Sequence, residues 1–174
     1  MRELLIGCGS RRDRLLRTNG HDSFSELVTL DINADHKPDI LWDLEKLPYP
    51  FKNNEFDEIH AYEVLEHLGD QGDYKAFFAQ FSEIWRILKP DGMLCATCPS
   101  AKSNWAWGDP SHRRIVSPES LTFLSQKAYE EQVGKTAMSD FRYIYQADFE
   151  PVYINDDGQT FAFVMRAIKE QVCH

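Results

Sequence analysis

Two glycines and an aspartate have the types and the spacing of a site for a ribose-containing ligand. Leu4-Leu5-Ile6 runs into Gly7-Cys8-Gly9, which indicates a buried strand that ends in a tight turn. Glycine lacks a Cβ, so the backbone turns sharply and a ligand can approach it closely. Asp31 ends the next apolar run, and a carboxylate at a strand tip accepts hydrogen bonds from both ribose hydroxyls. The pattern predicts a nucleoside-containing cofactor; the alternative is a strand-to-helix turn without a ligand.

A second group has the residue types of acid–base or metal chemistry. Glu63, Glu66 and His67 stand at i, i+3 and i+4 of a predicted short helix, so all three lie on one face. His112 follows in a loop after a later strand. Two carboxylates and two imidazoles suit a divalent ion such as Mg²⁺, Mn²⁺, Fe²⁺ or Zn²⁺. Neutral His67 or His112 is also matched to proton abstraction near pH 7, whether or not an ion binds.

Length and composition predict one soluble globular domain over residues 1–174. No apolar run approaches the ~20 residues that cross a bilayer, and Met1-Arg2-Glu3 leads directly into a strand, which leaves no room for a signal peptide. The net charge of -9 disfavours broad binding to nucleic acid. We therefore expect no membrane partner and keep nucleic acid as a disfavoured partner, while the oligomeric state stays open.

Two further groups carry less specific signals. Cys95 and Cys98 have C-x-x-C spacing, but a predicted buried strand and the lack of a second pair argue against zinc. All four cysteines, which are Cys8, Cys95, Cys98 and Cys173, are expected to be reduced core residues of a cytoplasmic protein. The arginines after the glycine turn predict the solvated face of a short helix, and the alternative is contact with an anionic substrate. They are Arg11, Arg12, Arg14 and Arg17.

The elements that must position these residues alternate between strand and helix signals, as in a parallel sheet covered on both faces. The expected strands cover residues 3–6, 27–30, 39–42, 56–61, 93–98, 143–154 and 160–168. Asp73 caps a helix with one apolar stripe, Lys89-Pro90-Asp91-Gly92 ends it, and Ser117-Pro118-Glu119 opens another. Asn155-Asp156-Asp157-Gly158 predicts a C-terminal hairpin. The fold class is α/β with about seven strands, mostly parallel.

This arrangement resembles the class I S-adenosylmethionine-dependent methyltransferases, of the type 11-like group, over nearly the whole chain. Five segments carry the resemblance, namely Ile6-Gly7-Cys8-Gly9-Ser10, Asp31, Asp43-Leu44, Phe56 to Ile59 with Glu63 to Leu68, and Lys89 to Leu94. It implies a three-layer Rossmann-like sandwich with S-adenosyl-L-methionine as the cofactor. The residues it assigns to the cofactor are Ile6, Gly7, Cys8, Gly9, Asp31, Ile32, Asp43, Leu44 and Glu63.

The adenine end of that site has a physical rationale. Asp43 follows the apolar Ile40-Leu41-Trp42, so its carboxylate stands at the tip of a strand. There it can accept a hydrogen bond from the adenine amine, with Leu44 and Ile32 on either side of the ring. The alternatives are a turn cap for Asp43 and core packing for the two apolar residues.

The four acid–base residues also resemble the metal site of the small-RNA 2′-O-methyltransferases and the ubiquinone-pathway O-methyltransferases. The resemblance implies Glu63, Glu66, His67 and His112 around an ion that holds two vicinal hydroxyls and lowers the pKa of one. In relatives without a metal, the first Glu supports the cofactor and the others pack or cap the helix. We expect methyl transfer to oxygen on a small molecule or sugar, with Glu63, His67 and His112 near the chemistry.

Two other functions stay open. Nucleic-acid methylation is disfavoured by the acidic charge and by Ala61-Tyr62-Glu63-Val64 in place of an Asn/Asp-Pro-Pro-aromatic motif. A catalytically silent module that binds the cofactor or a partner is favoured by Leu5, which stands where the family often has an acid. The third glycine of the family turn is also absent.

Overall fold

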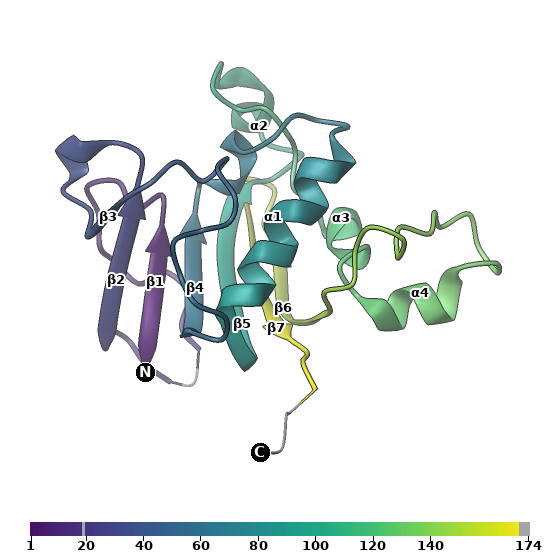
Figure 1. The fold of residues 1–174 in the computed structure, drawn as a ribbon. Coiled ribbons are helices and arrows are strands. Elements are labelled where there is room, and N and C mark those ends of the chain that lie inside the picture. Colours follow the sequence, from purple (N-terminus) through teal and green to yellow (C-terminus); the bar gives the residue numbers. More distant parts are fainter. Residues whose placement is uncertain (19, 171–174) are drawn as a thin grey trace.

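The computed structural model describes residues 1–18 and 20–170, which form one seven-stranded sheet and its coverings (Figure 1). The strands are β1 (Arg2–Ile6), β2 (Glu26–Asp31), β3 (Ile40–Leu41), β4 (Phe56–Tyr62), β5 (Leu88–Pro99), β6 (Phe149–Asp156) and β7 (Thr160–Ala167). Their order is β3-β2-β1-β4-β5-β7-β6, parallel through β5 and antiparallel at β7 and β6. The predicted mixed sheet is confirmed, and its order reverses between β1 and β4, where open α/β sheets form a crevice at their carboxyl edge.

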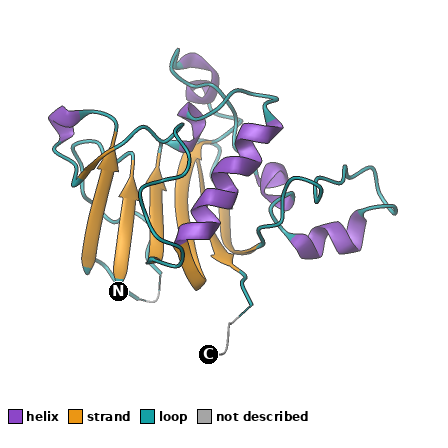
Figure 2. Ribbon diagram, in the orientation of Figure 1, coloured by secondary structure: helices purple, strands orange, loops and turns teal. Residues whose placement is uncertain are grey.

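The longest helix, α1 (Tyr74–Ile87), lies across one face of the sheet (Figures 1 and 2). Asp73 caps it as predicted, since its side chain accepts from the Ala76 N–H at 3.0 Å. The shorter helices are η1 (Ala34–His36), η2 (Leu65–His67), α2 (Asn104–Gly108), α3 (Pro118–Thr122) and α4 (Gln126–Gln132), where η marks a 3-10 helix. Ser117 caps α3 and Pro118 begins it, also as predicted.

Two predicted boundaries are wrong. The Lys89–Gly92 stop lies inside β5, where the register with β4 shifts between Phe56 and Glu58 and the chain bulges. The predicted strand from Tyr143 starts only at Phe149. Backbone N–H groups of Ile144 and Tyr145 both donate to the Phe141 carbonyl at 2.9 Å, so a turn occupies this segment.

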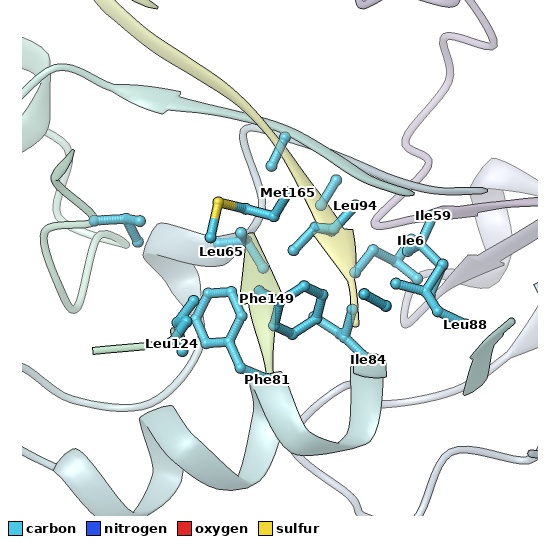
Figure 3. Packing of buried hydrophobic residues seen from close by; sticks show 14 of the residues in the cluster. Ile6, Ile59, Leu65, Phe81, Ile84, Leu88, Leu94, Leu124, Phe149 and Met165 are labelled. Atoms are coloured by element: carbon cyan, nitrogen blue, oxygen red, sulfur yellow. The ribbon is translucent and has the colours of Figure 1, made fainter. Parts of the chain in front are cut away.

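One face of the sheet buries apolar side chains, and the other buries ion pairs. Alternation along each strand puts Leu4, Ile6 and Ile59 on the face that α1 covers, where they join one apolar cluster with Phe81 and Ile84 (Figure 3). Burial of such side chains contributes about 1.5–3 kcal/mol each. This cluster holds the carboxyl ends of β1 and β4 in register.

The other face carries a buried ionic cluster, which we call the Arg14 cluster. Arg14 pairs with Glu3 and with Glu58, and all three side chains are at most 2% exposed. His60 Nε2 lies 3.2 Å from Glu58 Oε2 and its Nδ1 lies 2.7 Å from the Tyr62 hydroxyl. These contacts fix the β1–β2 connection onto the sheet.

The prediction of a short helix with a solvated arginine face is wrong for the helix and for Arg14, whereas Arg11 and Arg17 are exposed as predicted. Residues 7–18 and 20–25 form no helix, and Arg14 points into the protein. The reason is long-range: Glu3 and Glu58 offer buried carboxylates on neighbouring strands, and these outweigh local helix propensity.

Three cysteines are buried in the described part of the chain. Cys8, Cys95 and Cys98 are buried free thiols, whereas Cys173 lies outside the described residues. Within residues 1–18 and 20–170, every helix is too short or too polar to span a bilayer.

Candidate functional site

The glycine turn and the tip of β2 are joined by one carboxylate. Gly7 and Gly9 have φ of 57° and 51°, values that glycine reaches freely. Asp31 Oδ2 accepts from the Gly9 N–H at 2.8 Å, and Oδ1 accepts from the Asn33 N–H at 2.8 Å. Burial works against ionisation of Asp31, but these hydrogen bonds and His36 outweigh it, so its pKa lies below the ordinary value. Asp31 is thus a carboxylate near neutral pH.

A cavity of about 430 Å³ opens beside this carboxylate, at the carboxyl edge of the sheet. Its lining is Gly7, Gly9, Asp31, Ile32, His36, Trp42, Asp43, Leu44, Glu45, Val64, His67 and Leu68. Ile32 is 67% exposed, which is unusual for a large apolar side chain. Its exposed surface is available to an apolar ligand.

Gly7 is packed against the protein, whereas Gly9 borders the open cavity. A Cβ on Gly7 would meet Val64 Cγ2 at 2.3 Å, so Gly7 is required by packing. A Cβ on Gly9 would meet nothing within 4 Å. Gly9 therefore faces open space that a ligand can fill closely.

A cluster of one carboxylate and two imidazoles adjoins the cavity. His67 and His112 have ring centroids 4.8 Å apart, and each Nε2 lies 4.0 Å from Glu66 Oε1. Glu66 is 2% exposed, and both of its carboxylate oxygens lack a hydrogen-bond partner. Burial raises the pKa of Glu66 to about 7. The Glu66 carboxyl can therefore gain or lose a proton near neutral pH.

The main chain explains why residues from two distant segments meet. The backbone N–H groups of Arg113 and Arg114 donate to the Glu66 carbonyl at 2.9 and 3.2 Å. Arg114 Nε donates to the Leu65 carbonyl at 2.9 Å. The loop after β5 is thereby fixed to η2, which places His112 beside His67.

Glu63 does not share this arrangement. It precedes η2 instead of lying on it, it has φ of 53°, and it is exposed. The prediction of three side chains on one helix face is wrong, because β4 extends to Tyr62 and the chain turns sharply before η2 begins. The structure groups Glu66, His67 and His112 without Glu63.

The model of a methyltransferase domain matches residues 4–96, which is more than half of the chain. The chain belongs to this family, the class I S-adenosylmethionine-dependent methyltransferases. No curated protein sequence matches it.

Solved structures of methyltransferases share the fold. A SAM-dependent methyltransferase from Archaeoglobus fulgidus has a TM-score of 0.57 at 18% identity, covering 95% of this chain and 86% of the other. The N-methyltransferase NodS from Bradyrhizobium japonicum, in complex with S-adenosyl-l-homocysteine, has a TM-score of 0.56 at 16% identity, covering 97% and 78%. A putative methyltransferase of Haloferax volcanii, in complex with the Trm112 activator, has a TM-score of 0.56 at 16% identity, covering 96% and 82%. At such identities the likeness concerns the fold alone.

In this methyltransferase domain, six of the residues predicted from sequence for the cofactor line the cavity: Gly7, Gly9, Asp31, Ile32, Asp43 and Leu44. Ile6 and Cys8 are buried behind the turn, with the Cys8 N–H bonded to the Leu30 carbonyl. Glu63 is not part of the lining. Asp43 also accepts from the Glu45 N–H at 3.0 Å, so the turn-cap alternative holds as well.

Sequence reasoning did not assign five residues of this lining to the site: His36, Trp42, Glu45, Val64 and Leu68. His36 Nδ1 lies 3.3 Å from Asp31 Oδ1, and Trp42 follows β3 directly. A signal for His36 existed: Asn33 is an N-cap residue type two positions after Asp31, which predicts a tight turn that brings His36 back.

Proposed function

We propose that this methyltransferase domain transfers a methyl group from S-adenosyl-L-methionine to a hydroxyl oxygen of a small molecule or sugar. One observation carries the proposal: His67 belongs both to the lining of the cavity and to the cluster with Glu66 and His112. A hydroxyl must lose a proton as it is methylated, and this arrangement brings a proton acceptor to the edge of the cofactor site.

The cavity suits the cofactor in shape and in charge. Gly9 leaves room for close approach of the ligand to the backbone, and Asp31 offers a carboxylate for the ribose hydroxyls. Ile32 and Leu44 offer apolar surface for the adenine ring, and Asp43 offers an acceptor for its amine. S-Adenosyl-L-methionine, when bound, supplies a methyl group activated by a sulfonium centre.

The orientation of His67 supports its role as the base. Its Nδ1 lies 3.1 Å from the Ser111 carbonyl, which only accepts hydrogen bonds. In the neutral ring Nδ1 therefore carries the proton, and the lone pair is on Nε2, which faces Glu66 and His112. Nε2 of His67 takes the hydroxyl proton, and the Glu66 carboxylate, 4.0 Å from this nitrogen, stabilises the imidazolium that results. Positioning of the two reactants in line supplies the rest of the rate enhancement.

The same three side chains fit a divalent ion. Glu66 keeps two buried carboxylate oxygens without partners, and one donor atom each from Glu66, His67 and His112 lie within 4.8 Å of one another. Carboxylate and imidazole suit Mn²⁺, Fe²⁺ or Zn²⁺. An ion held there would lower the pKa of a coordinated hydroxyl. Glu63, predicted from sequence as a fourth ligand, stands apart from this set.

The cofactor assignment is tested by calorimetry with S-adenosylhomocysteine. Asp31→Ala should weaken binding by roughly 1.5–3 kcal/mol, the scale of hydrogen bonds to a charged group. Gly9→Val should abolish binding, because its side chain enters the space that the ligand needs. Its positive φ strains any side chain at this position, so the unfolding midpoint of the variant is measured alongside its affinity. Asp35→Ala, an exposed acid on the same loop, is the control and should bind normally. Equal affinity of Asp31→Ala and the native protein would refute the ribose assignment.

The assignment of a hydroxyl oxygen as the methyl acceptor is tested by an activity assay. A panel of hydroxylated small molecules and sugars, amines and oligonucleotides should give methylation on oxygen, with loss of about 10²–10⁴ in rate for His67→Ala. Methylation of amines or oligonucleotides alone would contradict the proposal. Tight cofactor binding without turnover on the panel would favour a silent module.

The ion is tested separately from the cofactor by titration with Mn²⁺ at about pH 8, where the Glu66 carboxyl is ionised. The native protein should bind Mn²⁺, and Glu66→Gln should not. Glu63→Gln, which removes a neighbouring acid outside the cluster, should bind like the native protein. Mn²⁺ binding that is absent, or that survives in Glu66→Gln, would remove the ion from the proposal and leave the base in place.

A further inference from the structure

The glycine turn is followed by an arginine that bridges two walls of the cavity. Arg12 Nη1 donates to the carbonyls of Gly9 at 2.5 Å and Cys8 at 3.2 Å. Its Nη2 donates to the carbonyl of His36 at 2.7 Å. One guanidinium therefore connects the turn after β1 to η1, which lies on the loop after β2.

This contact complements the one made by Asp31. The Asp31 carboxylate collects N–H groups from the same two loops, at Gly9 and Asn33. Arg12 collects their carbonyl groups, at Gly9 and His36. Opposite charges thus hold the two loops from two sides, and both loops contribute lining residues to the cavity.

The backbone needs such a contact at this place. In many strand-turn-helix units a helix follows the turn and its regular hydrogen bonds order the segment. Residues 10–18 and 20–25 are not helical, so that order is missing here. Arg14 fixes the connection to the sheet further along, but its contacts are with Glu3, Glu58, Thr18 and the Leu16 carbonyl, all outside the turn.

We propose that Arg12 is a positioning residue for the cofactor: it sets the spacing between the glycine turn and η1, and so the shape of the cavity on both sides of Asp31. The inference rests on the proposed function, since it takes this cavity as the cofactor site. A planar guanidinium donates in two directions at once, which the single ammonium of lysine does not reproduce. Arg12 acts through the two loops and not by contact with the reacting atoms.

The experiment compares Arg12→Ala and Arg12→Lys with Arg11→Ala. Arg11 is the matched control, because it has the same charge one residue earlier and its side chain is 84% exposed. Among the described residues its one ion pair is with Asp13. Calorimetry should show S-adenosylhomocysteine bound on the order of tenfold or more weaker by Arg12→Ala, since two charge-assisted hydrogen-bond directions are lost. Arg12→Lys should not restore it, and Arg11→Ala should bind normally. The thermal unfolding midpoint should stay close to native in all three.

Hydrogen exchange of the cofactor-free protein supplies the second readout. Arg12→Ala should speed exchange in residues 7–12 and in residues 33–37 together, while β4 and β5 stay protected. Native affinity in Arg12→Ala, full rescue by lysine, or faster exchange in only one of the segments would overturn the proposal. If the native protein binds no S-adenosylhomocysteine, the proposed function fails, and the paired exchange still decides whether Arg12 joins the loops.

Discussion

Arg14→Ala is expected to destabilise the fold by about 3–5 kcal/mol, the cost of leaving a buried charge without its partner. The guanidinium contacts Glu3 and Glu58, and its side chain has no exposed surface. Burial opposes ionisation of Glu58, but hydrogen bonds from His60 and Thr18 and the charge of Arg14 outweigh it, so its pKa lies below the usual range. Without the guanidinium, two carboxylates face each other inside the protein.

Urea denaturation near neutral pH measures this loss. Arg17→Ala is the control, since Arg17 is 69% exposed on the same connection and pairs with Asp22, and its effect should stay within about 0.5 kcal/mol. Adding Glu3→Gln and Glu58→Gln to Arg14→Ala should recover part of the stability, because the unpaired charges are then gone. Equal effects of the two arginine variants would show that the Arg14 cluster does not stabilise the fold.

Glu66→Gln is expected to stabilise the metal-free protein at alkaline pH. The folded pKa of Glu66 is about 7 and its ordinary value is 4.5. Because the pKa of Glu66 is raised in the folded state, ionisation of Glu66 costs no stability below pH 4.5. Its ionisation lowers the free energy of unfolding as the pH rises through 4.5 and toward 7. The fall amounts to about 3 kcal/mol, at roughly 1.4 kcal/mol for each pKa unit. Glutamine resembles the protonated carboxyl and does not ionise, so its variant escapes this loss.

The measurement is urea denaturation in EDTA at about pH 4.5 and about pH 8. The variant should match the native protein at the lower pH and exceed it by about 3 kcal/mol at the higher pH. Glu63→Gln should show only a small gain, since Glu63 is itself exposed and its charge contributes less than burial to the raised pKa of Glu66. Parallel pH profiles for Glu66→Gln and the native protein would mean that folding does not raise the pKa of Glu66.

What the sequence predicted well was local. The glycine turn, the Asp31 strand tip and the Asp73 and Ser117 caps are each specified within a few residues, and each was found where it was expected. The order of the strands within the sheet was not predicted, because strand pairing over 50 or more residues leaves no local signal.

What the sequence reasoning got wrong depended on distant partners. The neighbours of Arg14 in the sequence are polar, which predicts an exposed side chain. In the fold Arg14 is buried, because it pairs with Glu3 on β1 and Glu58 on β4. Polar residues at alternate positions of Glu58-Ile59-His60 were the available sign that the second face of the sheet also has a buried, polar interior. Glu63 was placed on a helix by spacing alone, but the strand before it runs longer and forces a left-handed turn.

The division of the molecule along the chain has a consequence for any attempt to dissect it. Every residue that lines the cavity lies between Gly7 and Leu68, so a fragment ending there would contain the whole lining. That fragment would lack α1, which packs its apolar side chains on the face of β1 and β4, and β5, which pairs with β4 along its edge. The first half of the chain thus supplies the lining of the cavity, and the second half supplies the packing that stabilises it. Ligand binding and cooperative unfolding should therefore be lost together when the chain is shortened far enough to remove α1 and β5, although neither element lines the cavity.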